Sequence, residues 1–215
     1  MSVELFRTIT LLSSCIVIVP LSIALFRFRA LNFEQRYLTI LLGVTAAVEA
    51  GANYFWYNGW NNLLIYHFYT VVQFILITLL YTRKLEGLFP SVLFRILISA
   101  FILFAITNAV FFQSVRSLNT NVIILGSFIY ILFSISYFYK LLKEVNYESL
   151  QNNPMFWINA GILIYFSSTL ILFVLGNRLI PESLRVIGVA WSLHALFNIF
   201  LNMFYALALW VKPQT

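Results

Sequence analysis

The sequence predicts an all-α integral membrane protein, a bundle of seven transmembrane helices that forms a single domain over residues 1–215. Apolar residue types make up 62% of the 215 positions and charged residues only 9%, whereas a soluble domain carries roughly a quarter charged residues. One hydrophobic core could not bury so much apolar surface, so lipid must surround most of the chain. The stretches between the apolar runs are short and leave no room for a separate soluble domain.

Each of the seven apolar runs approaches the length of about 20 residues that a helix needs to cross a bilayer. Only helices and closed barrels can span lipid. Barrel strands would alternate polar and apolar residues, whereas these runs are apolar on every face. The predicted spans are therefore helices, at Leu5–Phe26, Tyr37–Tyr54, Leu63–Tyr81, Val92–Phe112, Val122–Tyr139, Phe156–Leu175 and Val186–Trp210.

The first apolar run is interpreted as a retained helix, because it ends in Arg27 and Arg29 where a signal peptide would have an A-x-A-like cleavage site. Pro20 is the only proline in the middle of a span and predicts a kink near the centre of this helix. Cys15 is the only cysteine in the chain, so no intrachain disulfide can form.

The distribution of Lys and Arg predicts the orientation in the membrane. The net charge of +6 comes from basic residues between the spans, where they act as topology signals, so we expect no nucleic-acid partner. The positive-inside rule places the larger set in the cytoplasm, and the N-terminus then lies outside and the C-terminus inside. The larger set is Arg27, Arg29, Arg36, Arg83, Lys84, Arg95, Lys140, Lys143 and Lys212, and the smaller set is Arg7, Arg116, Arg178 and Arg185.

Ionisable and amide side chains within the spans are the candidate functional residues, because each needs a partner or a role at bilayer depth. Glu49 is the only acid deep in a span, and the chain contains no Asp. The polar residues of the second, third and seventh spans fall in the outer half of the membrane by the helical rise per residue. We therefore predict an outward-facing ligand-binding pocket formed by Glu49, Asn53, His67, Trp191, His194 and Asn198.

Three interpretations of this pocket remain open. The polar groups can serve as hydrogen bonds between helices, or they can sense protons or a small ligand, since pairing would decide their charge. Two histidines and one carboxylate could also form an open zinc or iron site. No lysine lies deep in the last span, so a retinal cofactor is excluded, and no catalytic motif such as G-x-S-x-G or H-E-x-x-H occurs.

Two further patterns concern packing. Gly43, Ala47 and Gly51 form a stripe of small residues on the second span, which predicts close contact with neighbouring helices and a central position in the bundle. At the start of the sixth span, Pro154 suits the first helical turn and Asn152 or Asn153 is a plausible N-cap.

The segment from Asn153 to Phe166, together with Trp191, His194 and Asn198, resembles the seven-helix membrane region that precedes the kinase domain in some Bacteroidetes-type sensor histidine kinases. The resemblance is clear over the last third of the chain. It implies a receptor-like module of a bacterial inner membrane whose inward C-terminus passes a signal to a cytoplasmic signalling protein. The sequence departs from the kinase pattern because it contains no phosphoacceptor or ATP-binding domain.

Two functions follow from these observations. The first is a non-enzymatic sensor in the lipid bilayer that binds an unknown small ligand in the outer pocket. The alternative is a small transporter or channel that uses Glu49, His67 and His194 as a proton or ion relay. The absence of Gly or Pro interruptions from the sixth and seventh spans argues against broken helices of the transporter type.

Overall fold

The computed structural model describes residues 3–143, 150–179 and 184–212. Within these ranges all regular structure is helical, and seven stretches are long and apolar enough to cross a membrane. The predictions of an all-α fold and of seven helices long and apolar enough to span a membrane are confirmed. The elements are α1 (Val3–Cys15), α2 (Ile18–Phe26), η1 (Phe28–Ala30), α3 (Phe33–Tyr57), α4 (Leu63–Lys84), α5 (Ser91–Phe111), α6 (Thr120–Lys143), η2 (Leu150–Asn152), α7 (Pro154–Leu179) and α8 (Leu184–Trp210).

The chain divides into two compact units. Met1–Ala46 and Tyr147–Thr215 form the first unit, and Ala47–Asn146 form the second, so that α3 begins in one and ends in the other. The prediction of a single domain over residues 1–215 stays a prediction.

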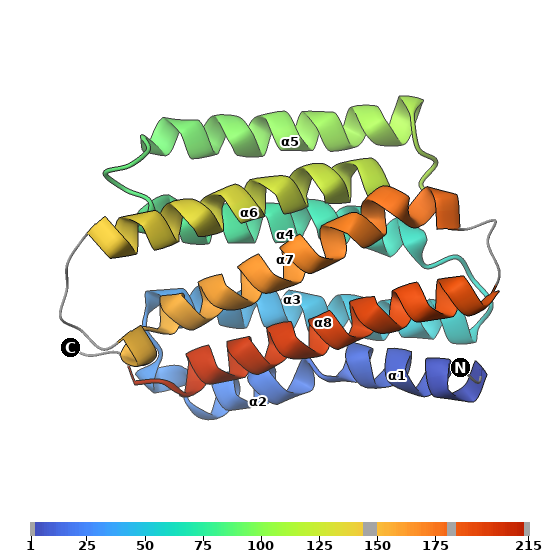
Figure 1. Cartoon of the computed structure of the whole chain (residues 1–215), viewed down its shortest axis with the longest axis horizontal. Coiled ribbons are helices and arrows are strands. Elements are labelled where there is room, and N and C mark those ends of the chain that lie inside the picture. The colour runs from blue at the N-terminus through green and yellow to red at the C-terminus, as the bar shows by residue number, and fades with distance from the viewer. Residues whose placement is uncertain (1–2, 144–149, 180–183, 213–215) are drawn as a thin grey trace. The chain divides into compact units, whose positions relative to one another are not determined.

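In the first unit α8 is the helix around which the others pack. It lies alongside α7 and also contacts α1 and α2 (Figure 1). Gly161 on α7 allows the close approach of α8, because a Cβ atom at this position would lie 2.9 Å from the Cβ of Phe204 and 3.2 Å from the Cδ1 of Leu201. Helices in lipid associate mainly through such tight van der Waals contact at small residues.

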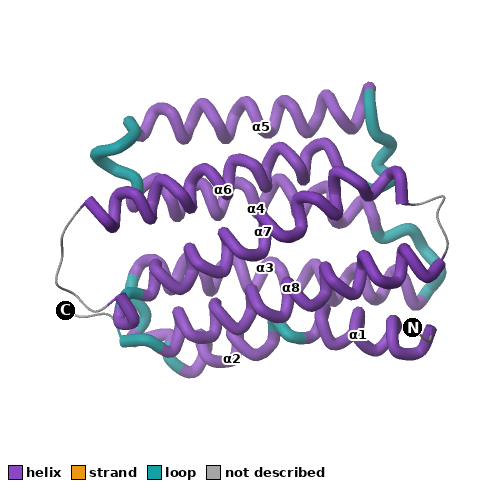
Figure 2. The backbone as a smooth tube through the Cα atoms, viewed as in Figure 1, coloured by secondary structure: helices purple, strands orange, loops and turns teal. Residues whose placement is uncertain are grey.

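The first span is interrupted in its middle. It consists of α1 and α2, which are separated at Ile16 and Val17 (Figure 2). Pro20 has no backbone N–H, and its ring would clash with the carbonyl group of Ile16, four residues earlier. The carbonyl oxygen of Ile16 instead accepts a hydrogen bond of 3.0 Å from the nitrogen of Val19. The predicted kink is thus a break, placed one helical turn before the proline.

Two helices of the first unit begin at side-chain caps. Asn32 and Gln35 form a capping box at the start of α3, in which each side-chain oxygen accepts a hydrogen bond of 3.0 Å from the backbone nitrogen of the other residue. This helix therefore starts at Phe33, earlier than the sequence predicts. At the start of α7, the Oδ1 of Asn153 accepts a hydrogen bond of 2.9 Å from the nitrogen of Met155, which confirms Asn153 as the N-cap.

In the second unit, α4, α5 and α6 contact one another around an aromatic core. The rings of Phe74 and Phe101 stack with their centroids 3.6 Å apart, and both side chains are fully or almost fully buried. Gly126 on α6 leaves room for this stack, since a Cβ atom there would lie 3.4 Å from the Phe101 ring. The hydroxyl groups of Tyr81 and Ser134 form a buried hydrogen bond of 3.0 Å between α4 and α6.

The stripe of small residues on α3 does not make the close helix contacts that the sequence predicts. A Cβ atom built on Gly43 would meet no atom within 4 Å, and Ala47 is exposed. Gly51 has one ordinary contact, with the Cδ1 of Ile65 at 3.8 Å. Contrary to the prediction, no close helix packing occurs at Gly43 or Ala47 among the described residues. Small residues permit close approach only where a neighbouring helix uses the space, as α8 does at Gly161.

Candidate functional site

His194 lies at the centre of an aromatic cluster between α7 and α8. Its Nε2 forms a hydrogen bond of 3.0 Å with the hydroxyl group of Tyr165. The ring centroids of Trp191, Phe173 and Tyr165 lie 5.5, 5.6 and 5.8 Å from that of the imidazole, all in edge-to-face orientation. Edge-to-face contacts of this kind are favourable between aromatic rings and hold the imidazole in a fixed orientation.

Helix periodicity explains how this cluster is assembled. Trp191 precedes His194 by three residues on α8, and Tyr165 and Phe173 are eight residues apart on α7, so each pair shares one helix face. The cluster therefore brings together two of the predicted site residues, Trp191 and His194. Tyr165 belongs to the segment that carries the family resemblance, but sequence reasoning assigned it no role.

Asn198, one turn beyond His194, faces the first span rather than α7. Its Nδ2 donates hydrogen bonds to the carbonyl oxygen of Ser13 at 2.9 Å and to the Oγ of Ser13 at 3.0 Å. Ser13 lies on α1, close to the break in the first span. In an uninterrupted helix this carbonyl group would accept a bond from residue 17. Asn198 therefore supplies a hydrogen-bond donor to the broken helix within the first apolar span.

Asn202 continues this polar face by a further turn. Its Nδ2 donates to the carbonyl oxygen of Asn198 at 2.9 Å, and the side chain is only 5% exposed. Its Oδ1 is buried and has no hydrogen-bond partner within the described part of the chain. A buried acceptor without a donor is rare in proteins and points to a ligand, a water molecule or stored strain.

The remaining predicted residues lie in the second unit. The hydroxyl group of Tyr66 donates to the Oε2 of Glu49 over 3.4 Å. His67 is 9% exposed, and its Nε2 forms a hydrogen bond of 3.1 Å with the carbonyl oxygen of Ser117 in the loop between α5 and α6. Asn53 is half-buried one turn after Glu49 on α3.

The structure thus gives the three ionisable residues separate partners. Glu49 bonds to Tyr66, His67 bonds to the Ser117 backbone, and His194 bonds to Tyr165. Glu49 and His67 share no hydrogen bond although both belong to the second unit. Because His194 belongs to the first unit, a pocket shared by all three stays a prediction. Among the residues that the structure describes, no group of three or more His, Cys, Asp or Glu is arranged to hold a metal ion.

Sequence reasoning missed a second cluster, at the carboxyl end of α8. The Nη1 of Arg27 donates to the carbonyl oxygens of Leu209, at 2.9 Å, and of Trp210. The guanidinium carbon of Arg27 also lies 5.7 Å from the centroid of the Trp210 ring. The last carbonyl groups of a helix have no partner within the helix and need donors from elsewhere.

Gln35 completes this arrangement from α3. Its Nε2 donates to the carbonyl oxygens of Ala208 at 2.8 Å and of Val211 at 3.0 Å, and its side chain is fully buried. Arg27 and Gln35 together cap the carboxyl end of α8, and we call these two residues the α8 clamp. The Asn32-x-x-Gln35 pattern is a readable capping signal in the sequence, but it does not reveal the contact with α8.

Comparisons of the chain with protein-family models, with curated proteins and with solved structures found no match.

Proposed function

We propose that this protein is a membrane sensor in which the aromatic cluster around His194 is the input site and the carboxyl end of α8 is the output. The arrangement of both features on one helix carries the proposal. His194 and Trp191 lie in the first half of α8, and the α8 clamp holds its last turn. Packed helices move as rigid elements. A change at His194 that shifts or rotates α8 must therefore alter the hydrogen bonds of the α8 clamp at the other end of the helix.

The chemistry of the cluster supports a response to protons or to a small polar ligand. The imidazole changes its charge within the physiological pH range more readily than other side chains. The Tyr165 hydroxyl group can accept a hydrogen bond from a protonated His194, and three aromatic rings surround the imidazole. A ligand or proton that binds one arrangement of α7 and α8 more tightly than another would shift the population between them.

A label at the end of α8 tests this proposal. We would replace Cys15 with Ala, introduce Lys212→Cys, attach a spin label and record its mobility in bilayers from mildly acidic to neutral pH. The expected result is a change in label mobility with pH that disappears in the His194→Phe variant, which retains an aromatic ring. A change that persists unaltered in this variant would contradict His194 as the input.

Transport of protons or small cations is the second candidate, and the break in the first span favours it. Discontinuous helices at membrane depth expose backbone carbonyl groups that bind ions in many transporters. Here Ser13 lies beside such a break, and the nearby Asn202 has a buried oxygen that receives no hydrogen bond from the described residues. Proteoliposomes with a trapped pH-sensitive dye would report a proton flux. A flux that depends on Asn202 would favour this function over the sensor.

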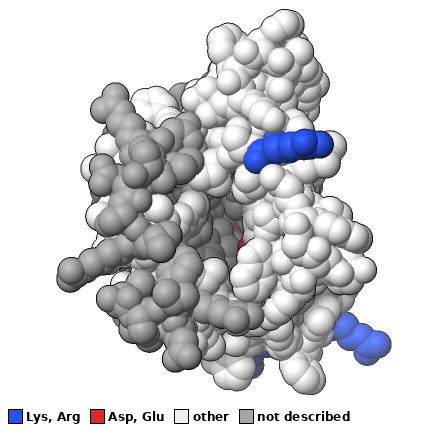
Figure 3. Space-filling model, turned by 90° about the vertical axis from the view of Figure 1, so that its right-hand side faces the viewer, with Lys and Arg blue, Asp and Glu red and all other residues white. Residues whose placement is uncertain are grey.

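We also propose that the N-terminus lies outside and the C-terminus in the cytoplasm of a bacterial inner membrane. The nine-to-four distribution of Lys and Arg supports this orientation. In the view of Figure 3, the Lys and Arg side chains that can be seen lie apart from one another among described residues that are mostly uncharged. A reporter that is active only in the cytoplasm, fused after Thr215, should be active. A well-expressed but silent fusion would contradict the orientation.

A further inference from the structure

Glu49 has no positively charged partner among the residues that the structure describes. It lies deep within α3, a helix long and apolar enough to cross a membrane, and its side chain is half-buried. Its carboxylate receives a hydrogen bond from the hydroxyl group of Tyr66, and no described Lys, Arg or His pairs with it. A carboxylate in an apolar environment needs a positive charge close to it, because its own charge is costly to remove from water.

The contact between Glu49 and Tyr66 leaves capacity for a further ligand. The two oxygen atoms are 3.4 Å apart, whereas a hydroxyl group normally lies about 2.5–2.7 Å from a carboxylate oxygen to which it donates. An ionised carboxylate has about four acceptor positions, and Tyr66 uses one of them. The hydroxyl oxygen of Tyr66 donates its proton to Glu49 and keeps its own lone pairs. These two side chains therefore offer three oxygen atoms to a ligand.

The ends of α3 and α4 hold these two residues opposite each other. Asn62 directly precedes α4, and its Nδ2 donates a hydrogen bond of 3.3 Å to the carbonyl oxygen of Ala52 on α3. Glu49 lies about one turn before Ala52, and Tyr66 lies about one turn after Asn62. The chain reverses between the two helices, so this tether brings Glu49 and Tyr66 to the same level. A preformed site lowers the entropy lost on binding.

The face of α4 that carries Tyr66 is polar for two further turns. Tyr69 and Gln73 follow Tyr66 by three and seven residues, a spacing that places all three on one helix face. The Nε2 of Gln73 donates a hydrogen bond of 3.0 Å to the hydroxyl group of Tyr69. The hydroxyl groups of Tyr66 and Tyr69 also interact electrostatically. The surroundings of Glu49 on α4 therefore consist of oxygen-bearing groups rather than of hydrocarbon alone.

Ions can reach this site from the aqueous phase next to the connection between α3 and α4. Tyr66 lies three residues after the start of α4, and Glu49 lies eight residues before the end of α3. At a rise of 1.5 Å per residue these positions are about 5 and 12 Å from the helix ends. The 25 residues of α3 extend over about 37 Å, which exceeds the hydrocarbon thickness of about 30 Å. The end of α3 therefore projects into the polar region, whichever side of the membrane it faces.

The charge of the site selects a monovalent cation. One such ion makes the pair with Glu49 neutral, whereas a divalent ion leaves a net positive charge in an environment of low dielectric constant. Ca²⁺ also takes roughly six to eight oxygen ligands, commonly from several carboxylates. Transition metals prefer imidazole or thiolate ligands, but the printed contact of Glu49 is with a hydroxyl group. Oxygen atoms and a single negative charge suit an alkali-metal ion.

We propose that Glu49 and Tyr66 form a binding site for a monovalent metal cation such as Na⁺. The ion supplies the positive charge that Glu49 lacks, and the carboxylate and the hydroxyl oxygen of Tyr66 bind it together with water molecules. The site lies in the second unit and shares no residue with the aromatic cluster around His194. The inference is therefore independent of the sensor proposal, and it does not require transport.

The test is the thermal stability of the purified full chain in detergent, at a mildly alkaline pH at which protons compete least for the carboxylate. The chloride salts of Na⁺, Ca²⁺ and N-methylglucamine would be compared at equal ionic strength. We expect Na⁺ to stabilise the protein relative to N-methylglucamine, by about 1.4 kcal/mol for each tenfold increase in concentration above half-saturation. Identical melting in Na⁺ and N-methylglucamine would overturn the proposal. An effect of Ca²⁺ as large as that of Na⁺ would overturn the assignment to a monovalent ion.

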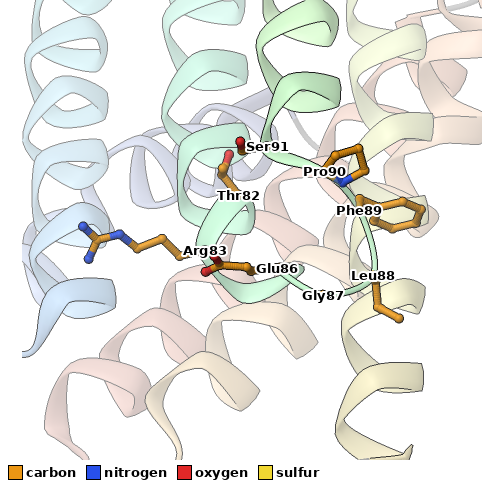
Figure 4. A pocket seen from close by; sticks show the side chains of 8 residues that line it. All are labelled: Thr82, Arg83, Glu86, Gly87, Leu88, Phe89, Pro90 and Ser91. Atoms are coloured by element: carbon orange, nitrogen blue, oxygen red, sulfur yellow. The ribbon is translucent and has the colours of Figure 1, made fainter.

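Two variants locate the effect, and each has a matched control. Glu49→Gln should abolish the response to Na⁺. Tyr66→Phe keeps the ring and should raise the concentration of half-maximal effect about tenfold. Glu86→Gln is the control for the carboxylate, because Figure 4 shows Glu86 in the loop after α4, at the opposite end of that helix from Tyr66. Tyr139→Phe is the control for the hydroxyl group, because Tyr139 on α6 is 56% exposed.

Each response is measured against the same variant in N-methylglucamine, so a change in basal stability does not obscure it. A Glu49→Gln protein that keeps the full response to Na⁺ would contradict the assigned site. The same conclusion would follow if Tyr66→Phe responded like the parent, or if either control variant lost the response.

Discussion

The side-chain amide of Gln35 on α3 donates a hydrogen bond of 2.8 Å to the carbonyl oxygen of Ala208 on α8, although the two residues are 173 positions apart in the sequence. The same side chain closes the capping box of α3 through its oxygen. The buried side chain of Gln35 therefore forms hydrogen bonds with backbone groups at the beginning of α3 and at the end of α8. Polar groups at buried helix ends contribute to stability chiefly because an unsatisfied group is costly.

Replacing Gln35 with Leu should destabilise the protein. The substitution leaves the carbonyl oxygen of Ala208 without its side-chain donor and opens the capping box, so we expect a loss of about 1–3 kcal/mol in the free energy of unfolding. Thermal unfolding in detergent measures the effect. Gln151→Leu is the control, because the side chain of Gln151 on η2 is exposed. Identical melting of the two variants would show that the contact with α8 adds nothing to stability.

Substitutions of two glycines by alanine should have opposite effects. Gly161→Ala places a Cβ atom 2.9 Å from that of Phe204, and overpacking of this kind typically lowers stability by about 1–3 kcal/mol. Gly43→Ala meets no atom within 4 Å and should stabilise α3 by up to about 1 kcal/mol through helix propensity. The two melting temperatures, compared with that of the parent, test both expectations. Destabilisation by Gly43→Ala would mean that α3 does pack closely at this position.

Replacing each of the two asparagines that follow His194 on α8 should have a different effect on stability. Asn198→Leu leaves the carbonyl oxygen of Ser13 beside the helix break without its side-chain donor, and should lower the free energy of unfolding by about 1–3 kcal/mol. Asn202→Leu removes a buried oxygen that has no donor among the residues described by the structure. The carbonyl group of Asn198 keeps its bond from the helix backbone in that variant. We therefore expect Asn202→Leu to be neutral or stabilising, and a large loss of stability would indicate that a bound water or ion satisfies this oxygen.

The sequence is sufficient to predict those features that depend on composition or on neighbouring residues. The spans follow from apolar length, the Asn153 cap from a short local pattern, and the interruption of the first span from Pro20. The contacts between distant residues could not be predicted. Gly43 and Gly161 both lie in apolar helices, and only the order of neighbouring helices decides that Gly161 is the one in tight contact.

The same limitation applies to the candidate site. The sequence indicates that His194 and Asn198 share a helix face, because they are four residues apart. It does not indicate that His194 contacts Tyr165 on α7 while Asn198 contacts Ser13 on α1. His194 and Glu49 each form a hydrogen bond with the hydroxyl group of a tyrosine. The aromatic content of an apolar span gives no sign of which tyrosine takes that role.

The hydrogen bond between Tyr165 and His194 should appear as a coupling energy in a double-mutant cycle. Tyr165→Phe, His194→Phe and the double variant all keep an aromatic ring at both positions, so the cycle isolates the polar contact of 3.0 Å. We expect a coupling of about 1 kcal/mol in the free energy of unfolding, the usual size for one hydrogen bond. Glu49→Gln combined with His67→Phe is the matched control, and these changes should be additive because the two residues bond to Tyr66 and to Ser117. If the effects of Tyr165→Phe and His194→Phe were additive, the hydrogen bond between these residues would contribute nothing measurable to stability. Strong coupling between Glu49→Gln and His67→Phe would instead place Glu49 and His67 in one site.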